Sequence, residues 1–168
     1  MAGIPFVREL KFAYGEADQV SPLIRRVIAE NPGPFTYLGT GVYIIGADEV
    51  AVIDPGPMLD KHFAALKRAL DGQRVTHVFT THTHLDHSPL AHPLAEWAGC
   101  KVYGRPDPAG THAMASLEED GQEGFMPDVL VKDGDTFTGP GWTLEAITTP
   151  GHMSNHVCYA LKQENALF

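Results

Sequence analysis

The stretch TTHTHLDHSPLAHP, residues 80–93, is the most informative part of this chain, because it holds four of its nine histidines. Within it, His82, His84, Asp86 and His87 fall close together. His82 and His84 are two residues apart, so at the end of an extended segment both side chains point the same way. Asp86 and His87 follow where the chain must turn. Clustered imidazoles repel one another when protonated unless a metal keeps them neutral, so the cluster predicts a metal site.

One loop does not easily supply all the ligands of a metal ion. A further imidazole is available in Thr149-Pro150-Gly151-His152, where a tight turn after a strand would project His152. Neutral imidazole suits zinc, and a carboxylate suits zinc, iron or manganese. Asp86 is placed to hold or deprotonate a water molecule whose pKa a metal lowers toward about 7.

The composition indicates one soluble globular domain of 168 residues, with 43% apolar and 20% charged residues. The net charge of −9 argues against broad electrostatic attachment to nucleic acid or to an anionic membrane. The start MAGIPFVREL lacks the apolar core of a signal peptide, and no apolar run approaches the roughly 20 residues of a membrane span. We therefore expect a cytoplasmic protein. Cys100 and Cys158 lack motif spacing and are expected to be buried free thiols.

The hydrophobic pattern predicts helices and strands that alternate at first, with strands dominating later, which favours an α/β or α+β domain. Strands are expected at 23–28, 35–46, 49–54, 74–80, 101–104, 141–149 and 157–162, with one more beginning at ENALF. The segments 35–46 and 49–54 would form a hairpin, and 128–137 a second one around Asp133-Gly134. Residues 106–127 are rich in glycine, proline and acidic residues, and we expect a mobile surface excursion there.

Two helices are predicted. Residues 58–72 repeat Leu59, Phe63, Leu66 and Leu70 at helical spacing, with His62 on the polar side. Ser88 can cap a second helix, with Pro89 in its first position, Leu94 and Trp97 facing the core and Pro93 kinking it. We expect His77, His92 and His112 to be surface or structural histidines.

The two histidine motifs resemble those of the metallo-β-lactamase superfamily. His82-Thr-His84-Leu-Asp86-His87 matches its HxHxDH motif, and Thr149-Pro-Gly-His152 matches its next metal-binding motif. Asn31-Pro-Gly-Pro-Phe-Thr-Tyr-Leu-Gly-Thr40 and Val52-Ile-Asp54-Pro-Gly56 resemble its N-terminal strands. The likeness covers about residues 23–168 and is closest to the β-lactamase-like protein 2 type, with glyoxalase II-like hydrolases nearby.

The resemblance implies an αββα sandwich, of which the chain holds the N-terminal half and the start of the second half. It also implies a dinuclear metal centre, usually zinc, with His82, His84 and His152 on the first metal and Asp86 and His87 on the second. A metal-bound hydroxide, with Asp86 as the catalytic carboxylate, would cleave an ester, thioester or phosphodiester. Asp54 resembles a family aspartate that orients a ligand histidine, although the turn alone explains an aspartate equally well.

The chain departs from the family at its C-terminal end. The aspartate that bridges the metals and the last histidine are absent, and ENALF would leave an apolar strand uncovered. We therefore expect a truncated domain with a weakened second metal site and self-association through an exposed sheet face.

Two classes of function stay open. The first is a metal-dependent hydrolase acting on a small ester or thioester, or on RNA. The second is an inactive or structural metal-binding half-domain. Oxygen reduction at a di-iron centre fits less well, because it replaces the His87-type arrangement with extra carboxylates.

Overall fold

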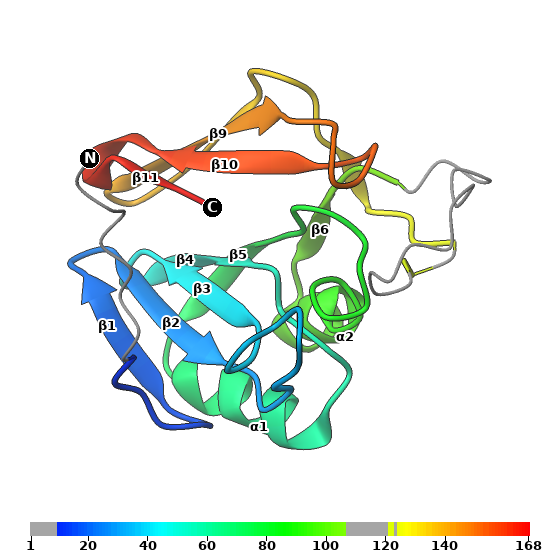
Figure 1. Cartoon of the computed structure of the whole chain (residues 1–168). Helices are drawn as coiled ribbons and strands as arrows, with labels where there is room; N and C mark the ends of the chain where they lie inside the picture. The colour runs from blue at the N-terminus through cyan, green and yellow to red at the C-terminus, as the bar shows by residue number, and fades with distance from the viewer. Residues whose placement is uncertain (1–9, 107–120, 123) are drawn as a thin grey trace, which may run out of the picture.

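The computed structural model describes residues 10–106, 121–122 and 124–168, which form two β-sheets and two α-helices (Figure 1). The larger sheet has seven strands in chain order: β1 (Ala17–Ser21), β2 (Ile24–Ile28), β3 (Gly41–Ile45), β4 (Glu49–Ile53), β5 (Arg74–Phe79), β6 (Lys101–Gly104) and β7 (Val129–Leu130). The smaller sheet has the order β11 (Ala166–Leu167), β10 (Val157–Leu161), β9 (Trp142–Thr148), β8 (Thr136–Gly139). The helices are α1 (Asp60–Ala69) and α2 (Ala91–Ala98), with a 3₁₀ turn η1 (Lys162–Glu164).

The layers follow from the two faces of the larger sheet. Side chains on one face, such as Val52 and Val78, pack with Leu66 of α1 and Leu94 of α2. Side chains on the other face, such as Ile53, pack against residues of the smaller sheet. Figure 1 shows the smaller sheet lying across that face. The expected fold class is confirmed: the described residues form a helix–sheet–sheet arrangement of the α/β sandwich type. Within these residues, no α-helix follows β9 or β10 to cover the outer side of the smaller sheet.

Strand direction places the histidine-rich loop. Strands β1 to β4 are antiparallel, whereas β4, β5, β6 and β7 are parallel. Helix α1 connects β4 to β5, and α2 connects β5 to β6. Carboxyl ends of neighbouring parallel strands meet at one sheet edge. Asp54 after β4 and Thr81 after β5 therefore lie side by side, and the loop between β9 and β10 brings His152 from the other sheet.

The hairpin predicted within 128–137 is wrong. Val129 and Leu130 pair in parallel with β6 of the larger sheet, whereas β8 pairs with β9 of the smaller one. The turn at Asp133-Gly134 carries the chain from one sheet to the other, with Val131 buried between them. The hairpin is instead β8–β9, turning at 139–142, because Thr136 to Gly139 have their partner in Trp142 to Glu145.

The helix predictions need three corrections. His62 is buried rather than on a polar face, and its Nε2 donates to the Pro55 carbonyl at 3.0 Å. Trp97 is 46% exposed rather than in the core. The second helix begins after Leu90, so Pro93 lies in its first turn, where the missing N–H is not needed and no kink results.

Several smaller expectations also change. The strand expected at 35–46 begins only at Gly41, because Tyr37 and Gly39 have positive φ. A Cβ at Gly39 would lie 1.9 Å from the Ala29 carbonyl oxygen, so only glycine fits there. Strand β1, which is half-exposed and lacks an apolar pattern, was not predicted. Cys100 and Cys158 are free thiols but only half-buried.

The predicted excursion at 106–127 is described only in part, since residues 107–120 and 123 lie outside the described residues, as does His112. The part that is described includes Phe125, which is 3% exposed and belongs to the helix-side core. Neither α1 nor α2 has the length and hydropathy that a helix crossing a membrane requires. The outer face of the smaller sheet carries Glu145 beside Ile147, and self-association through it stays a prediction.

Candidate metal centre

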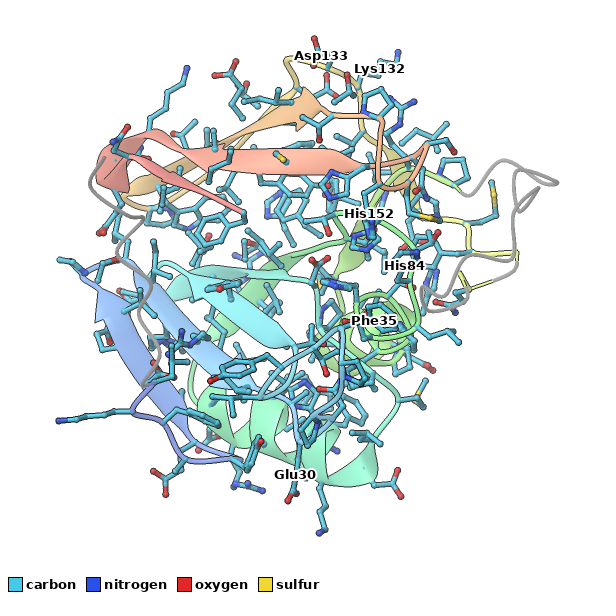
Figure 2. All side chains as sticks on the ribbon, in the orientation of Figure 1. Glu30, Phe35, His84, Lys132, Asp133 and His152 are labelled. Atoms are coloured by element: carbon cyan, nitrogen blue, oxygen red, sulfur yellow. The ribbon has the colours of Figure 1, made fainter. Side chains whose placement is uncertain are left out.

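Three histidine nitrogens converge where the two sheets meet. His82 Nε2 lies 3.0 Å from His84 Nδ1, and His152 Nε2 lies 3.1 Å from the same atom. Figure 2 shows His84 and His152 next to one another, although they come from loops of different sheets. His82 and His84 are buried and His152 is exposed. The structure thus brings together the three residues that the sequence predicts for a first metal.

The spacing of these nitrogens suits zinc. Two ligand nitrogens at about 2.05 Å from a tetrahedral zinc ion are roughly 3.3 Å apart. The observed separations of 3.0 and 3.1 Å are close to that value, and all three ligand atoms lie within 4.8 Å of one another. The donor set therefore fits a metal that prefers neutral imidazole.

Asp86 and His87 form a second group beside the first. His87 Nε2 lies 3.1 Å from Asp86 Oδ2, and the His87 ring centroid is 4.3 Å from that of His82. The Thr40 hydroxyl donates to Asp86 Oδ2 at 2.7 Å. Asn31 holds Thr40 in turn, since its Oδ1 accepts from the Thr40 N–H at 2.9 Å. Asp86 thus has a fixed orientation toward His87.

Asp54, at the carboxyl end of β4, orients a histidine in each group: His82 through Thr81, and His87 directly. This buried carboxylate follows β4 with φ of 50° and accepts from the Thr81 N–H and the Thr81 hydroxyl, each at 2.7 Å. Its Oδ2 also accepts from His87 Nδ1 at 2.9 Å. The structure therefore gives Asp54 a histidine partner, beyond the turn that could have explained it alone. Asp54, His82 and His87 also form a group whose ligand atoms lie within 4.8 Å.

The Thr81 hydroxyl sets the tautomer of His82. A carboxylate only accepts, so this hydroxyl gives its hydrogen to Asp54 and must accept from His82 Nδ1, 2.8 Å away. His82 Nε2 is then left without a hydrogen and can act as a metal ligand. His87 is arranged in the same way, with Nδ1 toward Asp54 and Nε2 toward Asp86.

Charges in the cluster are strongly coupled. Burial, with the nearby charge of His87, lowers the pKa of His82 to about 3. Burial also acts to lower the pKa of His87, but Asp54 and Asp86 outweigh it and raise the pKa to about 10. Burial tends to raise the pKa of Asp54, yet the charge and hydrogen bond of His87 lower it overall. Without a metal, His87 therefore carries the positive charge and His82 stays neutral.

A cavity of about 410 Å³ opens beside these residues. The cavity is lined by Gly41, Tyr43, Ile53, Asp54, Thr81, His82, His87, His156, Leu167 and Phe168. Tyr43 and Phe168 are in contact, with ring centroids 5.0 Å apart. One wall is therefore apolar and the other carries imidazoles.

The other histidines that the structure describes lie outside the two ligand groups. His156 faces His82 at 5.1 Å between ring centroids and pairs through Nδ1 with the Thr149 hydroxyl at 2.8 Å. His77 stacks on Phe79 between the sheets, and His92 donates to the Met126 carbonyl.

Sequence reasoning missed the residues that support the cluster. Thr40 and Asn155 hold the loop from other segments, and Thr81, within the loop, ties it to Asp54 at the carboxyl end of β4. Only Thr81 carries a signal in the sequence, namely its position directly before His82.

Comparison with known proteins supports the same family. The family model of the metallo-β-lactamase superfamily matches residues 37–168. The chain is 33% identical over 156 residues to atrochrysone carboxyl ACP thioesterase AgnL7 of Paecilomyces divaricatus, covering 91% of this chain and 45% of that protein. It is 30% identical over 159 residues to lactamase-like protein adaB of Aspergillus niger, covering 91% of this chain and 45% of that protein.

A similar fold occurs among solved structures. The β-lactamase domain protein from Burkholderia ambifaria superposes with a TM-score of 0.70 at 21% identity, over 98% of this chain and 56% of that one. The chain spans about half the length of the curated relatives it matches.

Proposed function

Because the chain belongs to the metallo-β-lactamase superfamily, we propose that it works as a metal-dependent hydrolase that cleaves a thioester or a related ester. The observation that carries the proposal is the convergence of His82 Nε2, His84 Nδ1 and His152 Nε2 at 3.0 and 3.1 Å. Three imidazole nitrogens this close, of which His82 Nε2 is left without a hydrogen by the Thr81 contact, have the geometry of a ligand set rather than of ordinary packing.

We assign the predicted ligands as follows: His82, His84 and His152 hold a first metal ion, and Asp86 and His87 hold a second. Zinc suits this set best, with iron or manganese as alternatives because of the carboxylate. When bound, such an ion lowers the pKa of a coordinated water toward about 7 and polarises a carbonyl group.

Asp86 is the proposed catalytic carboxylate. Its Oδ2 is held by the Thr40 hydroxyl at 2.7 Å and faces His87 Nε2 at 3.1 Å. A carboxylate fixed at that point can orient an attacking water or accept its proton. Asp54 keeps the nitrogens of His82 and His87 directed at the cluster, directly for His87 and through Thr81 for His82.

The choice of a thioester rests on two observations. A relative with 33% identity is named a carboxyl ACP thioesterase. The cavity beside the histidines has an apolar wall that includes Tyr43 and Phe168, which suits the carbon skeleton of an acyl group. The net charge of −9 disfavours the alternative RNA substrate.

The test is turnover by the zinc-loaded chain with three probes: an acyl N-acetylcysteamine thioester, a p-nitrophenyl ester and bis(p-nitrophenyl) phosphate. We expect thioester cleavage that chelation abolishes and that falls at least 100-fold in His84→Ala. Asp48→Asn, on an exposed side chain, serves as the control. Faster cleavage of the phosphate diester would move the proposal to a nuclease.

Zinc binding without turnover of any probe would support the second reading, an inactive or structural metal-binding half-domain. The same assay on a chain extended to the length of its relatives then separates a missing second half from an absent activity. Size-exclusion chromatography tests self-association, and a clean monomer would count against it.

A further inference from the structure

Asn155 ties the His152 loop to the histidine-rich loop. Its side chain is 2% exposed, and its Nδ2 donates to the Thr83 hydroxyl at 3.1 Å and to the Arg105 carbonyl at 3.3 Å. Thr83 stands between His82 and His84 and is fully buried. The contact therefore joins the segment that carries two of the converging imidazoles to the loop that carries the third.

Thr83 is a fixed point for this contact. Its carbonyl accepts from the Gln122 N–H at 2.6 Å, and His84 pairs with Gly121 in an isolated bridge. The Gln122 side chain accepts from Ser88 at 2.8 Å. Thr83 cannot follow a displaced Asn155 without breaking these bonds, so the contact positions the His152 loop rather than the reverse.

The neighbouring contacts leave this task to Asn155. Farther along, the Val157 N–H donates to the Thr81 carbonyl at 2.8 Å and the Tyr159 hydroxyl to the Thr80 carbonyl at 3.1 Å. Both contacts anchor β10, beyond the loop. Asn155, three residues after His152, instead bonds to the histidine-rich segment from within the loop itself.

The chemistry of the amide group supports a role for its donors. Arg105 offers a carbonyl, which only accepts, so the NH₂ end of Asn155 must face it. Both hydrogens of Nδ2 are then used, whereas the buried Oδ1 has no hydrogen-bond partner among the described residues. A buried acceptor without a partner lowers stability. An asparagine is therefore explained by what its two donors hold.

We propose that Asn155 is a positioning residue, which holds the His152 loop in register with Thr83 so that the third imidazole meets the first two. The proposal rests on the metal-binding role proposed above for His82, His84 and His152. A residue that fixes ligand orientation without touching the metal typically changes metal affinity by about 10- to 100-fold.

The test compares variants of the whole chain. Asn155→Asp keeps the shape and removes both donors, and Asn165→Asp makes the same change on an exposed side chain. Thr83→Val removes the acceptor, and Thr83→Ser restores it. The zinc dissociation constant is measured by competition with a chromophoric chelator, and the absorption spectrum of the Co²⁺-loaded protein reports ligand geometry.

We expect Asn155→Asp and Thr83→Val to raise the zinc dissociation constant by about 10-fold or more, with an altered Co²⁺ spectrum, while Thr83→Ser and Asn165→Asp stay near wild type. In the metal-free protein, the amides of 151–155 should exchange hydrogen faster in Asn155→Asp while that of Val157 does not. If Asn155→Asp fails to fold, Thr83→Val against Thr83→Ser decides by the same measurements.

Unchanged affinity together with unchanged exchange in Asn155→Asp would overturn the positioning role. A wild-type chain that binds no zinc would overturn the proposed function instead, and the exchange measurement on the metal-free protein then decides on Asn155 alone.

Discussion

Replacing Asp54 by asparagine should weaken metal binding by two histidines, His82 and His87, at once. The substitution keeps the shape, and asparagine tolerates the positive φ of 50° at this position. The Thr81 N–H must still find an acceptor, so the amide oxygen takes the place of Oδ1. The NH₂ group then takes the place of Oδ2, where it faces the Thr81 hydroxyl and His87 Nδ1.

This reversal spreads through the hydrogen bonds. In the neutral form of His87 that could bind a metal, Nδ1 must become an acceptor, which places its one hydrogen on Nε2. The Thr81 hydroxyl no longer donates to residue 54 and turns toward His82 Nδ1, so the hydrogen of His82 also moves to Nε2. Both Nε2 atoms then carry hydrogen where a metal needs a lone pair. Since one such orienting partner is worth about 10- to 100-fold in metal affinity, two affected ligands should weaken zinc binding by about 100-fold or more.

The same variant should lose stability in the metal-free protein. One pKa unit corresponds to about 1.4 kcal/mol, so the rise of the His87 pKa from 6.5 to about 10 corresponds to a net stabilisation of about 5 kcal/mol after the opposing effect of burial. Asp86 contributes a part, so we expect Asp54→Asn to lower the free energy of unfolding by about 2 kcal/mol near pH 6. Because the folded-state pKa of His87 is raised, its contribution is full below about pH 6.5 and is lost as the pH rises through about 10. The difference from wild type should shrink over that range.

Two measurements check this reasoning: chelator competition for zinc, and urea unfolding of the metal-free protein at pH 6 and pH 10. Asp48→Asn, an exposed site, is the control. A zinc dissociation constant for Asp54→Asn within threefold of that control would refute the tautomer argument. A stability difference that is equal at both pH values would refute the ion-pair argument.

Three further changes test the packing. Phe125→Ala should lower the free energy of unfolding by about 3–5 kcal/mol if the segment around it is part of the core, as its 3% exposure indicates; a loss below 1 kcal/mol in urea unfolding would contradict this. Trp142→Phe leaves the Glu49 carbonyl without the indole N–H that donates to it at 2.9 Å, and should cost about 1–3 kcal/mol in the same assay. Burial lowers the pKa of His62, so below about pH 6.5 the unfolded state binds a proton that the folded state does not, and the free energy of unfolding falls. His62→Gln should reduce the slope of the free energy of unfolding against pH by up to about 1.4 kcal/mol per pH unit. An unchanged slope between pH 5 and 6.5 would count against a buried neutral histidine.

Much of the fold could be predicted from local patterns. The helical spacing of Leu66 and Leu70 and the apolar runs of β4, β5 and β9 fall where expected, because periodicity reports which side of an element is buried. The prediction of a hairpin at 128–137 failed because the two short strands on either side of Asp133-Gly134 look like partners in the sequence. In the structure they pair with β6 and β9 instead, and so belong to different sheets. The prediction that Trp97 faces the core failed because a helix of eight residues offers little pattern from which to define a buried face.

The sequence by itself predicted the donor set that we propose: His82, His84, Asp86 and His87 in one loop and His152 in another, with zinc as the metal that suits these residue types. Residue types and their spacing are read directly from the sequence, and they are sufficient to predict a metal site. The tertiary structure decided how these groups are held. Parallel pairing of β4 and β5 brings Asp54 to Thr81, which sets the tautomer of His82, and packing of the two sheets brings Asn155 to Thr83. Hydrogen bonds between residues far apart in the chain depend on strand order, and no local pattern in the sequence encodes that order.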